Sequence, residues 1–179
     1  LVIKRRFLYE HGCAAAMENR GIVAQWDSRA GRLTVWDTTQ APVVIRNGLA
    51  GMLGLSERNV RVIAPFIGGG FGARTETLNF ELVCGLLARA AGGRVRMVLS
   101  REETFLTHRG RPAADVRIKL GLSRGGKITA VAAEMTQLGG AYGGYGIVTI
   151  LYAGALLNAI YDIPAVRYEG YRVYSNTPP

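Results

Sequence analysis

The feature that most constrains the fold is a glycine-rich loop between a strand and a helix. The β-branched run Val60–Ala64 predicts a buried strand, and the apolar period over residues 77–91 predicts a helix that ends at Gly92 and Gly93. Between them, Gly68–Gly72 reads Gly-Gly-Gly-Phe-Gly. Glycines leave backbone N–H groups unshielded by a Cβ, and we expect the following helix to add the positive end of its dipole. Such a loop can hold an anion or an oxo group close to its backbone.

Two well-known anion-binding loops do not match this segment. The Gly-Lys-Ser/Thr of a phosphate-binding P-loop is absent, and the glycine spacing differs from the GxGxxG of dinucleotide-binding turns. Taken alone, the segment is equally well interpreted as a glycine-rich turn without a ligand. Its function therefore depends on what the rest of the sequence places around it.

The remaining pattern predicts an α+β fold with mixed or antiparallel sheets and packed helices. Within the helix predicted over residues 77–91, Leu78, Leu82, Leu86 and Ala90 recur every four residues and indicate the core-facing stripe. Residues 100–103 are predicted as a turn. The predicted strands are 3–9, 22–26, 32–36, 60–64, 94–99, 113–122, 127–137 and 166–174, and the predicted helices are 43–53, 77–91 and 148–161.

The length of 179 residues suits one domain or one large piece of a domain. The longest apolar stretch, Ile147–Ile160, contains Gly and Asn and is followed by Asp162, so we expect no membrane span. Leu1–Arg6 is charged and lacks the apolar core of a signal peptide. We therefore expect a cytoplasmic protein, with the periplasm as the alternative.

The cysteines and histidines indicate no metal site. Cys13 and Cys84 are far apart and belong to no CxxC or CxxH motif, so neither a zinc site nor an iron–sulfur cluster is expected from them. His11 and His108 are also distant in sequence. Any electron-transfer centre is expected on another domain or subunit.

The formal net charge of +9 raises the alternative of a nucleic-acid-binding domain. The 22 Lys and Arg residues are scattered, however, and no basic run is interleaved with aromatic residues. Acidic partners or an anionic cofactor explain the same excess through charge complementarity.

Several motifs together resemble one family. Gly68–Arg74 is similar to the GGGFGxK segment of the large subunits of molybdenum hydroxylases, the xanthine dehydrogenase, aldehyde oxidase and carbon monoxide dehydrogenase family. The flanking motifs agree in order and spacing. They are Met17–Gly21 (family MEPRG), Thr38–Gln40 (S/T-T/S-Q), Asn79–Glu81 (aromatic-Pro-Glu), Arg101–Phe105 (RxEdf) and Ser175–Pro179 (TNxxP).

The resemblance implies a role for each residue of the loop. Gln40 would donate its amide N–H to the apical oxo ligand of molybdenum, and Phe71 and Gly72 would line the metal, Gly72 with a backbone N–H. Gly69 and Gly70 would shape this contact. Neutral donors at fixed distances suit an oxo-sulfido centre. No direct metal ligand and no catalytic base is expected in this chain, since the base, a Glu, is expected downstream.

The resemblance also implies cofactors and partners. The cofactor is molybdenum on molybdopterin or its cytosine dinucleotide, iron–sulfur clusters and FAD sit on partner domains or subunits, and water supplies the oxygen. Substrates of such enzymes are aldehydes, N-heterocycles, carbon monoxide or related small molecules. Residues 1–179 would be one incomplete piece of the molybdopterin-binding domain, without its C-terminal remainder, inactive and cofactor-free when isolated. The alternative is a structural or assembly module that binds no cofactor.

Three residues depart from the family pattern. Asn19 replaces a Pro, Arg74 replaces a Lys, and Thr75 stands where purine-oxidising members carry a substrate-binding Glu, which disfavours a purine substrate. In the Met17–Gly21 motif, Glu18 and Arg20 are expected to form an ion pair that braces the loop.

Overall fold

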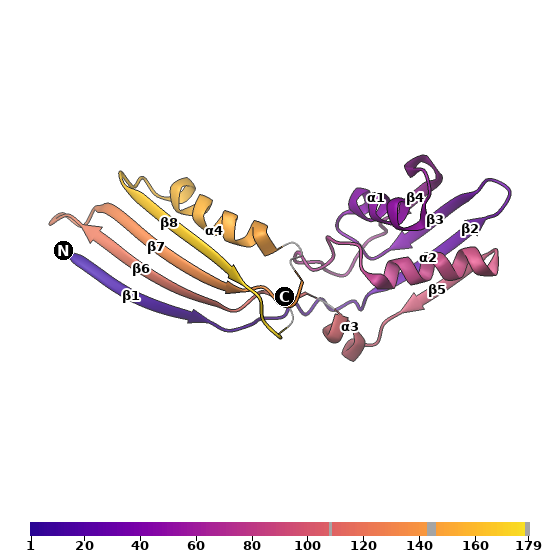
Figure 1. Cartoon of the computed structure of the whole chain (residues 1–179), viewed down its shortest axis with the longest axis horizontal. Helices are drawn as coiled ribbons and strands as arrows, with labels where there is room; N and C mark the ends of the chain where they lie inside the picture. The colour runs from indigo at the N-terminus through magenta and orange to yellow at the C-terminus, as the bar shows by residue number, and fades with distance from the viewer. Residues whose placement is uncertain (108, 143–145, 178–179) are drawn as a thin grey trace. The chain divides into compact units, whose positions relative to one another are not determined.

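The computed structural model describes residues 1–107, 109–142 and 146–177. Within these residues it confirms an α+β fold with two four-stranded mixed sheets (Figure 1). The elements are β1 (Val2–Tyr9), β2 (Gly21–Asp27), β3 (Arg32–Asp37), α1 (Pro42–Leu53), a 3₁₀ turn (Glu57–Asn59), β4 (Val60–Ile63), α2 (Asn79–Ala91), β5 (Arg94–Val98), α3 (Arg101–Thr107), β6 (Ala114–Leu122), β7 (Ile128–Leu138), α4 (Gly146–Ile160) and β8 (Val166–Val173).

The chain divides into two compact units. The terminal unit comprises Leu1–Cys13 and Arg109–Pro179, and the central unit comprises Ala14–His108. That the whole chain is a single piece of one cofactor-binding domain stays a prediction. In the part of the chain that the structure describes, no helix is both long enough and apolar enough to span a membrane.

In the terminal unit, one helix covers a four-stranded sheet. The strand order is β1-β6-β7-β8, with β7 and β8 parallel and the other pairs antiparallel. α4 packs against β8, where the Tyr168 hydroxyl donates to the Ile150 carbonyl at 2.9 Å. Gly154 brings the helix backbone against the ring of Tyr168, because a Cβ there would lie 2.5 Å from its Cδ1.

In the central unit, α1 and α2 pack on one face of the sheet ordered β4-β3-β2-β5. Alternation along β3 buries Leu33, Val35 and Asp37, as expected for a strand with one covered face. The buried apolar residues of this core are Ile22, Ala24, Leu33, Val35, Ile45, Leu49, Ala50, Leu53, Val60, Phe80, Cys84 and Ala88.

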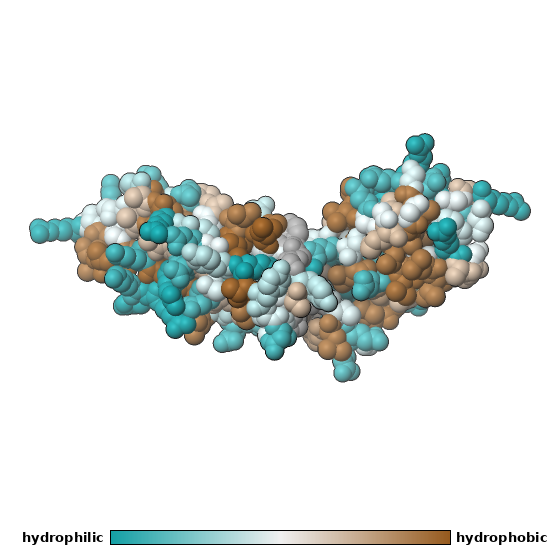
Figure 2. Space-filling view, viewed as in Figure 1, coloured by the Kyte–Doolittle hydropathy of each residue, from teal (hydrophilic) through white to brown (hydrophobic). Residues whose placement is uncertain are grey.

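Two local predictions are wrong. Residues 101–107 form a helix, α3, and not a turn, because Ser100 and Glu103 make a reciprocal capping box in which each side chain accepts from the other residue's backbone N–H, at 3.1 and 2.7 Å. The buried face of α2 is also out of phase with the predicted stripe. Leu86 is 46% exposed, while Cys84 and Ala88 are fully buried. The exposed apolar side of α2 contributes to the brown surface of the central unit in Figure 2.

The packing of α4 predicts opposite effects for two helical glycines. Gly154→Ala should lower the free energy of unfolding by about 1–3 kcal/mol, because its Cβ must displace the hydrogen-bonded ring of Tyr168. In α1, the Cβ added by Gly51→Ala would meet no atom within 4 Å, so this substitution should raise the free energy of unfolding by up to about 1 kcal/mol. Urea unfolding followed by circular dichroism measures both, and equal effects would contradict the packing of α4.

Candidate functional site

The glycine loop of the central unit is held in backbone conformations that favour glycine. Gly69 and Gly72 have φ of +106° and +86°, and Phe71 between them has φ of +52° although it carries a side chain. A left-handed conformation costs an ordinary residue about 1–2 kcal/mol. Phe71 is nevertheless 64% exposed. Strain combined with an exposed aromatic ring is typical of a functional position.

The loop orients the side chain of Gln40. The backbone N–H groups of Gly72 and Arg74 donate to Gln40 Oε1 at 2.9 and 3.4 Å. Two donors on this oxygen identify it as the carbonyl end of the amide. Among the described residues no acceptor binds the amide nitrogen, and Gln40 is exposed. The side chain therefore presents its two N–H donors outward from the loop.

The glycines allow a close approach of neighbouring segments. A Cβ on Gly70 would lie 2.2 Å from Gln40 Cδ, and a Cβ on Gly68 would lie 2.5 Å from the Cβ of Glu18. At Gly72, by contrast, a Cβ would meet nothing within 4 Å. The loop is thus closed on the side of Gln40 and Glu18 and open beside Gly72.

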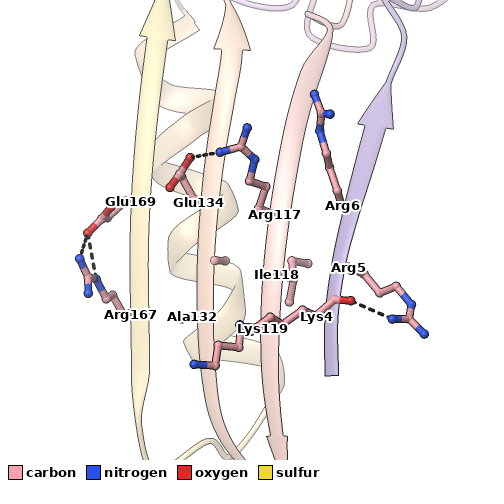
Figure 3. A pocket seen from close by; sticks show the side chains of 11 residues that line it. Lys4, Arg5, Arg6, Arg117, Ile118, Lys119, Ala132, Glu134, Arg167 and Glu169 are labelled. Carbon is pink, nitrogen blue, oxygen red and sulfur yellow. Dashed lines mark hydrogen bonds and ion pairs between the residues drawn. The ribbon is translucent and has the colours of Figure 1, made fainter. Parts of the chain in front are cut away.

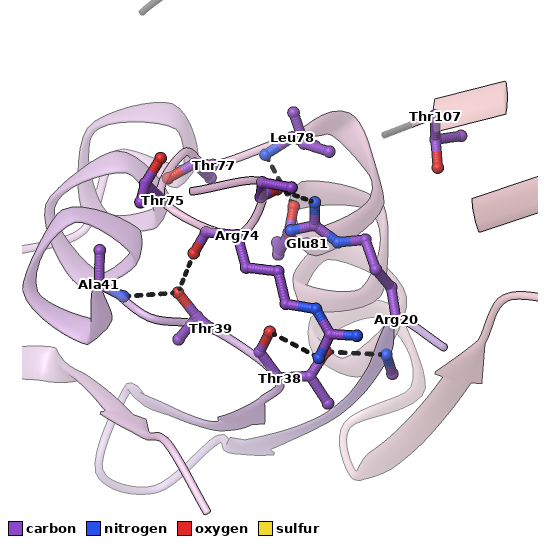
Figure 4. Close-up of polar contacts among 12 residues, drawn as sticks. Arg20, Thr38, Thr39, Ala41, Arg74, Thr75, Thr77, Leu78, Glu81 and Thr107 are labelled. Carbon is purple, nitrogen blue, oxygen red and sulfur yellow. Dashed lines mark hydrogen bonds and ion pairs between the residues drawn. The ribbon is translucent and has the colours of Figure 1, made fainter. Parts of the chain in front are cut away.

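Arg74 ties the loop to two other segments. Its backbone carbonyl accepts from Thr39 Oγ1 at 3.0 Å (Figure 4). The same carbonyl accepts from the backbone N–H of Gln40, also at 3.0 Å. Its guanidinium, 1% exposed, donates to the Glu18 carboxylate at 2.8 Å, to the Glu18 carbonyl, and to the Thr38 carbonyl at 3.4 Å. Three motifs far apart in sequence therefore meet at one buried cation.

A second buried pair lies at the start of α2. Arg20 donates to Glu81 at 2.6 Å, with side chains 1% and 0% exposed, and also to the Ala73 carbonyl at 3.2 Å (Figure 4). The other carboxylate oxygen of Glu81 accepts from the Leu78 N–H at 2.7 Å. The prediction of an ion pair between Glu18 and Arg20 is therefore wrong. Arg20 pairs with Glu81, and Glu18 pairs with Arg74.

The helix dipole does not support the loop as the sequence predicted. α2 begins at Asn79, so residues 73–78 separate it from Gly72. The carboxylate of Glu81 occupies the N-terminus of the helix. The site consequently offers amide donors and not a free helix terminus.

A second buried acid, Asp37, lies near these pairs. It is 1% exposed, and neither of its carboxylate oxygens has a hydrogen-bond partner among the described residues. Burial, reinforced by the charge of Glu81 and opposed by Arg20 and Arg74, raises the pKa of Asp37 to about 7. Burial likewise raises the pKa of Glu81, against the effect of Arg20. Sequence reasoning missed Asp37, although it continues the buried alternation of β3.

The five residues predicted to face a cofactor lie together, with one difference in detail. Gln40 contacts Gly72 and borders Gly70, while Gly69 supports the ring of Phe71. The N–H of Gly72, expected to point at a ligand, instead donates to Gln40. The outward donor is therefore the Gln40 amide.

The described residues hold no group of three His, Cys, Asp or Glu side chains suited to a metal ion. Cys13 is exposed, and Cys84 is a buried free thiol whose pKa burial raises to about 11. A thiol of this kind is unreactive at neutral pH. His108 lies outside the described residues.

Comparison with known proteins identifies relatives over the whole chain. A family model described as the molybdopterin cofactor-binding domain matches residues 1–179. The nicotinate dehydrogenase large molybdopterin subunit of Eubacterium barkeri is 36% identical over 156 residues, which make up 87% of this chain and 36% of that subunit. This chain therefore spans about a third of the length of this curated relative.

Two solved structures share the fold at moderate sequence identity. Quinoline 2-oxidoreductase from Pseudomonas putida 86 superposes with a TM-score of 0.90 at 30% identity, covering 100% of this chain and 23% of that chain. Carbon monoxide dehydrogenase from Oligotropha carboxidovorans superposes with a TM-score of 0.85 at 28% identity, covering 99% and 22%.

The buried pair at the start of α2 should be costly to break. Glu81→Ala leaves the guanidinium of Arg20 buried without its counter-charge, and we expect the free energy of unfolding to fall by about 3–5 kcal/mol. Glu57→Ala, which removes the exposed partner of Arg46, is the matched control and should cost less than about 1 kcal/mol. Urea unfolding of both variants provides the measurement, and similar losses would contradict the assigned burial.

The raised pKa of Asp37 predicts a pH-dependent stability. Between pH about 4 and 7 the folded protein retains a proton that this carboxyl loses in the unfolded chain, so its contribution to stability falls as pH rises through that window. Asp37→Asn removes this titration. The free energy of unfolding of the variant, relative to the unsubstituted protein, should therefore increase from about pH 5 to about pH 8. A difference that is the same at both pH values would show that Asp37 ionises normally.

Proposed function

Because this chain belongs to the molybdopterin cofactor-binding domain family, we propose that it forms one wall of the molybdenum site of a hydroxylase. The enzyme oxidises a small molecule and takes its oxygen from water. The observation that carries the proposal is the Gln40 amide, whose carbonyl end is held by two backbone N–H groups so that its N–H donors face outward. A neutral donor held in place in this way stabilises charge on an oxygen without reorganising.

The residues of the loop fit a molybdenum–pterin cofactor. Bound molybdenum supplies the oxidising centre and an oxo group that accepts a hydrogen bond. Gln40 would donate to that oxygen, while the exposed ring of Phe71 would keep water away and the open side of Gly72 would leave room beside it. Gly69 and Gly70 would hold this arrangement by allowing close backbone contact.

We propose an N-heteroaromatic compound as the first substrate class to test, with aldehydes and carbon monoxide as alternatives. The names of two relatives, a nicotinate dehydrogenase and a quinoline oxidoreductase, support this order. Purines are disfavoured, because Thr75 replaces the acidic residue of purine-oxidising members and its hydroxyl donates to the Gly72 carbonyl at 2.9 Å.

The rest of the catalytic machinery is proposed to lie outside this chain. A Glu base belongs to the remainder of the molybdenum subunit, and iron–sulfur clusters and FAD belong to partner domains or subunits. The chain alone is then inactive, and a cytoplasmic location remains the prediction from sequence.

The molybdenum content of the intact complex tests the proposal. The complex is isolated from its native host through a tag on this polypeptide, and the metal is measured by mass spectrometry. Near-stoichiometric molybdenum is expected. A complex without molybdenum, despite ample molybdate in the medium, would favour a structural or assembly module instead.

Gln40→Ala tests the role of the outward amide within that complex. We expect turnover to fall about 100-fold, as for the loss of one oriented donor to a developing negative charge, with the molybdenum content retained. Gln25→Ala is the matched control, since among the described residues that side chain accepts a hydrogen bond only from the exposed Arg94 on the neighbouring strand. Equal turnover of the two variants would contradict the proposed role of the Gln40 amide.

A further inference from the structure

Most of the net charge belongs to the terminal unit. Its residues include eleven Lys and Arg against five Asp and Glu, so it carries six of the nine net positive charges. Hydrophilic residues gather over β1 and β6 in Figure 2. This concentration lies on a unit that does not contain the glycine loop.

Strand register places like charges opposite each other on the sheet face that α4 does not cover. Lys4 of β1 is the direct partner of Lys119 of β6, and Arg6 is the direct partner of Arg117. On β7 and β8 the same row as the two lysines continues with Ala132 and Arg167. Like charges directly opposite on adjacent strands repel. Folding therefore brings together cations that separate strands would keep apart.

Three of the four arginines that line this part of the sheet are paired with acids, and the fourth, Arg5, donates to the Lys4 carbonyl at 2.8 Å and points away from the other strands (Figure 3). Arg6 binds Asp115 at 2.8 Å and Arg117 binds Glu134 at 3.3 Å. Arg167 binds Glu169 on its own strand (Figure 3). Each of these three cations thus has a counter-charge within the sheet.

The two lysines differ from the arginines. Among the residues that the structure describes, neither Lys4 nor Lys119 has an ion-pair partner, and both are exposed. In Figure 3 their side chains run across the sheet toward β7, where Ala132 offers no bulk. A hollow of about 620 Å³ lies over these residues. The hollow combines two unpaired ammonium groups with space for a ligand.

We propose that this basic hollow is a docking site for an acidic segment of another subunit, with a carboxylate seated between Lys4 and Lys119. That the segment comes from another subunit rests on the proposed function as part of a multi-subunit enzyme. That the segment is acidic rests on the strand register, which places the two lysines opposite each other. An acidic side chain there would relieve the repulsion between the two lysines.

The same hollow does not suit a nucleic acid. Glu134 and Glu169 line it and would repel a continuous phosphate backbone. Its lining residues include no aromatic ring on which a base could stack. Isolated carboxylates, in contrast, can sit at the lysines and avoid the acids.

Binding of fluorescein-labelled octaglutamate to the full chain, measured by fluorescence anisotropy at low salt, tests the chemistry. Lys4→Gln with Lys119→Gln should weaken binding about five-fold, as for the loss of two exposed ion pairs, and should raise the Tm of the free protein by removing the repulsion. Arg124→Gln with Lys127→Gln, which removes the same charge from the β6–β7 turn, should change binding less than about two-fold.

Equal losses of octaglutamate affinity in the two double variants would contradict the proposed site, because they would indicate attraction by net charge alone. Equally tight binding of an oligothymidylate of the same length through the same two lysines would also overturn it, in favour of nucleic acid. Neither measurement involves the molybdenum site, so a metal-free complex would refute the proposed function and leave this test unaffected.

Carbodiimide coupling in the native complex, which joins a lysine directly to a contacting carboxylate, tests the source of the segment. Lys4 or Lys119 should couple to acidic residues of another subunit. Coupling only to residues of the same polypeptide, or no coupling while Lys127 reacts, would contradict the proposal.

Discussion

The arrangement of the central unit depends on the buried guanidinium of Arg74. Burying a cation costs free energy unless its donors find acceptors, and the two terminal nitrogens of Arg74 find theirs in the Glu18 and Thr38 segments, while Nε has no partner among the described residues. Satisfying Arg74 therefore brings both segments against the glycine loop. The backbone of Arg74 then holds Gln40 and Thr39 through its carbonyl. A lysine at this position, typical of the family, has a single nitrogen and could not make the same set of contacts in a fixed plane.

Burying the acids behind the loop costs free energy. Arg20 offsets only part of the desolvation of Glu81, because both side chains are buried away from water and the pKa of Glu81 is still raised. Asp37 has no hydrogen-bond partner among the described residues and remains partly protonated near neutral pH. When Asp37 is neutral, the charges of the two buried arginines are balanced by the two carboxylates that bind them. Proton uptake by Asp37 thus limits the unbalanced charge beneath the loop.

The terminal unit is organised by different forces. α4 contains no charged residue, and one side packs on the sheet while Ile147, Leu151 and Ile160 remain more than half exposed. The opposite sheet face carries alternating Lys, Arg, Asp and Glu side chains. One sheet therefore presents an apolar helix on one side and a cationic hollow on the other. These are surfaces of opposite chemistry, which suit contacts of different kinds.

The sequence by itself determined most of the secondary elements, the α+β class and the glycine loop with Gln40, because period, turn residues and motif order are local or fixed along the chain. It also contained the capping box at Ser100 that starts α3. Only the tertiary structure decided which charges pair. Arg20 reaches Glu81, 61 positions away, and Lys4 meets Lys119 through strand register. Burial of Asp37 likewise depends on the helices that cover β3. Pairing and desolvation depend on distances in space, which no local pattern specifies.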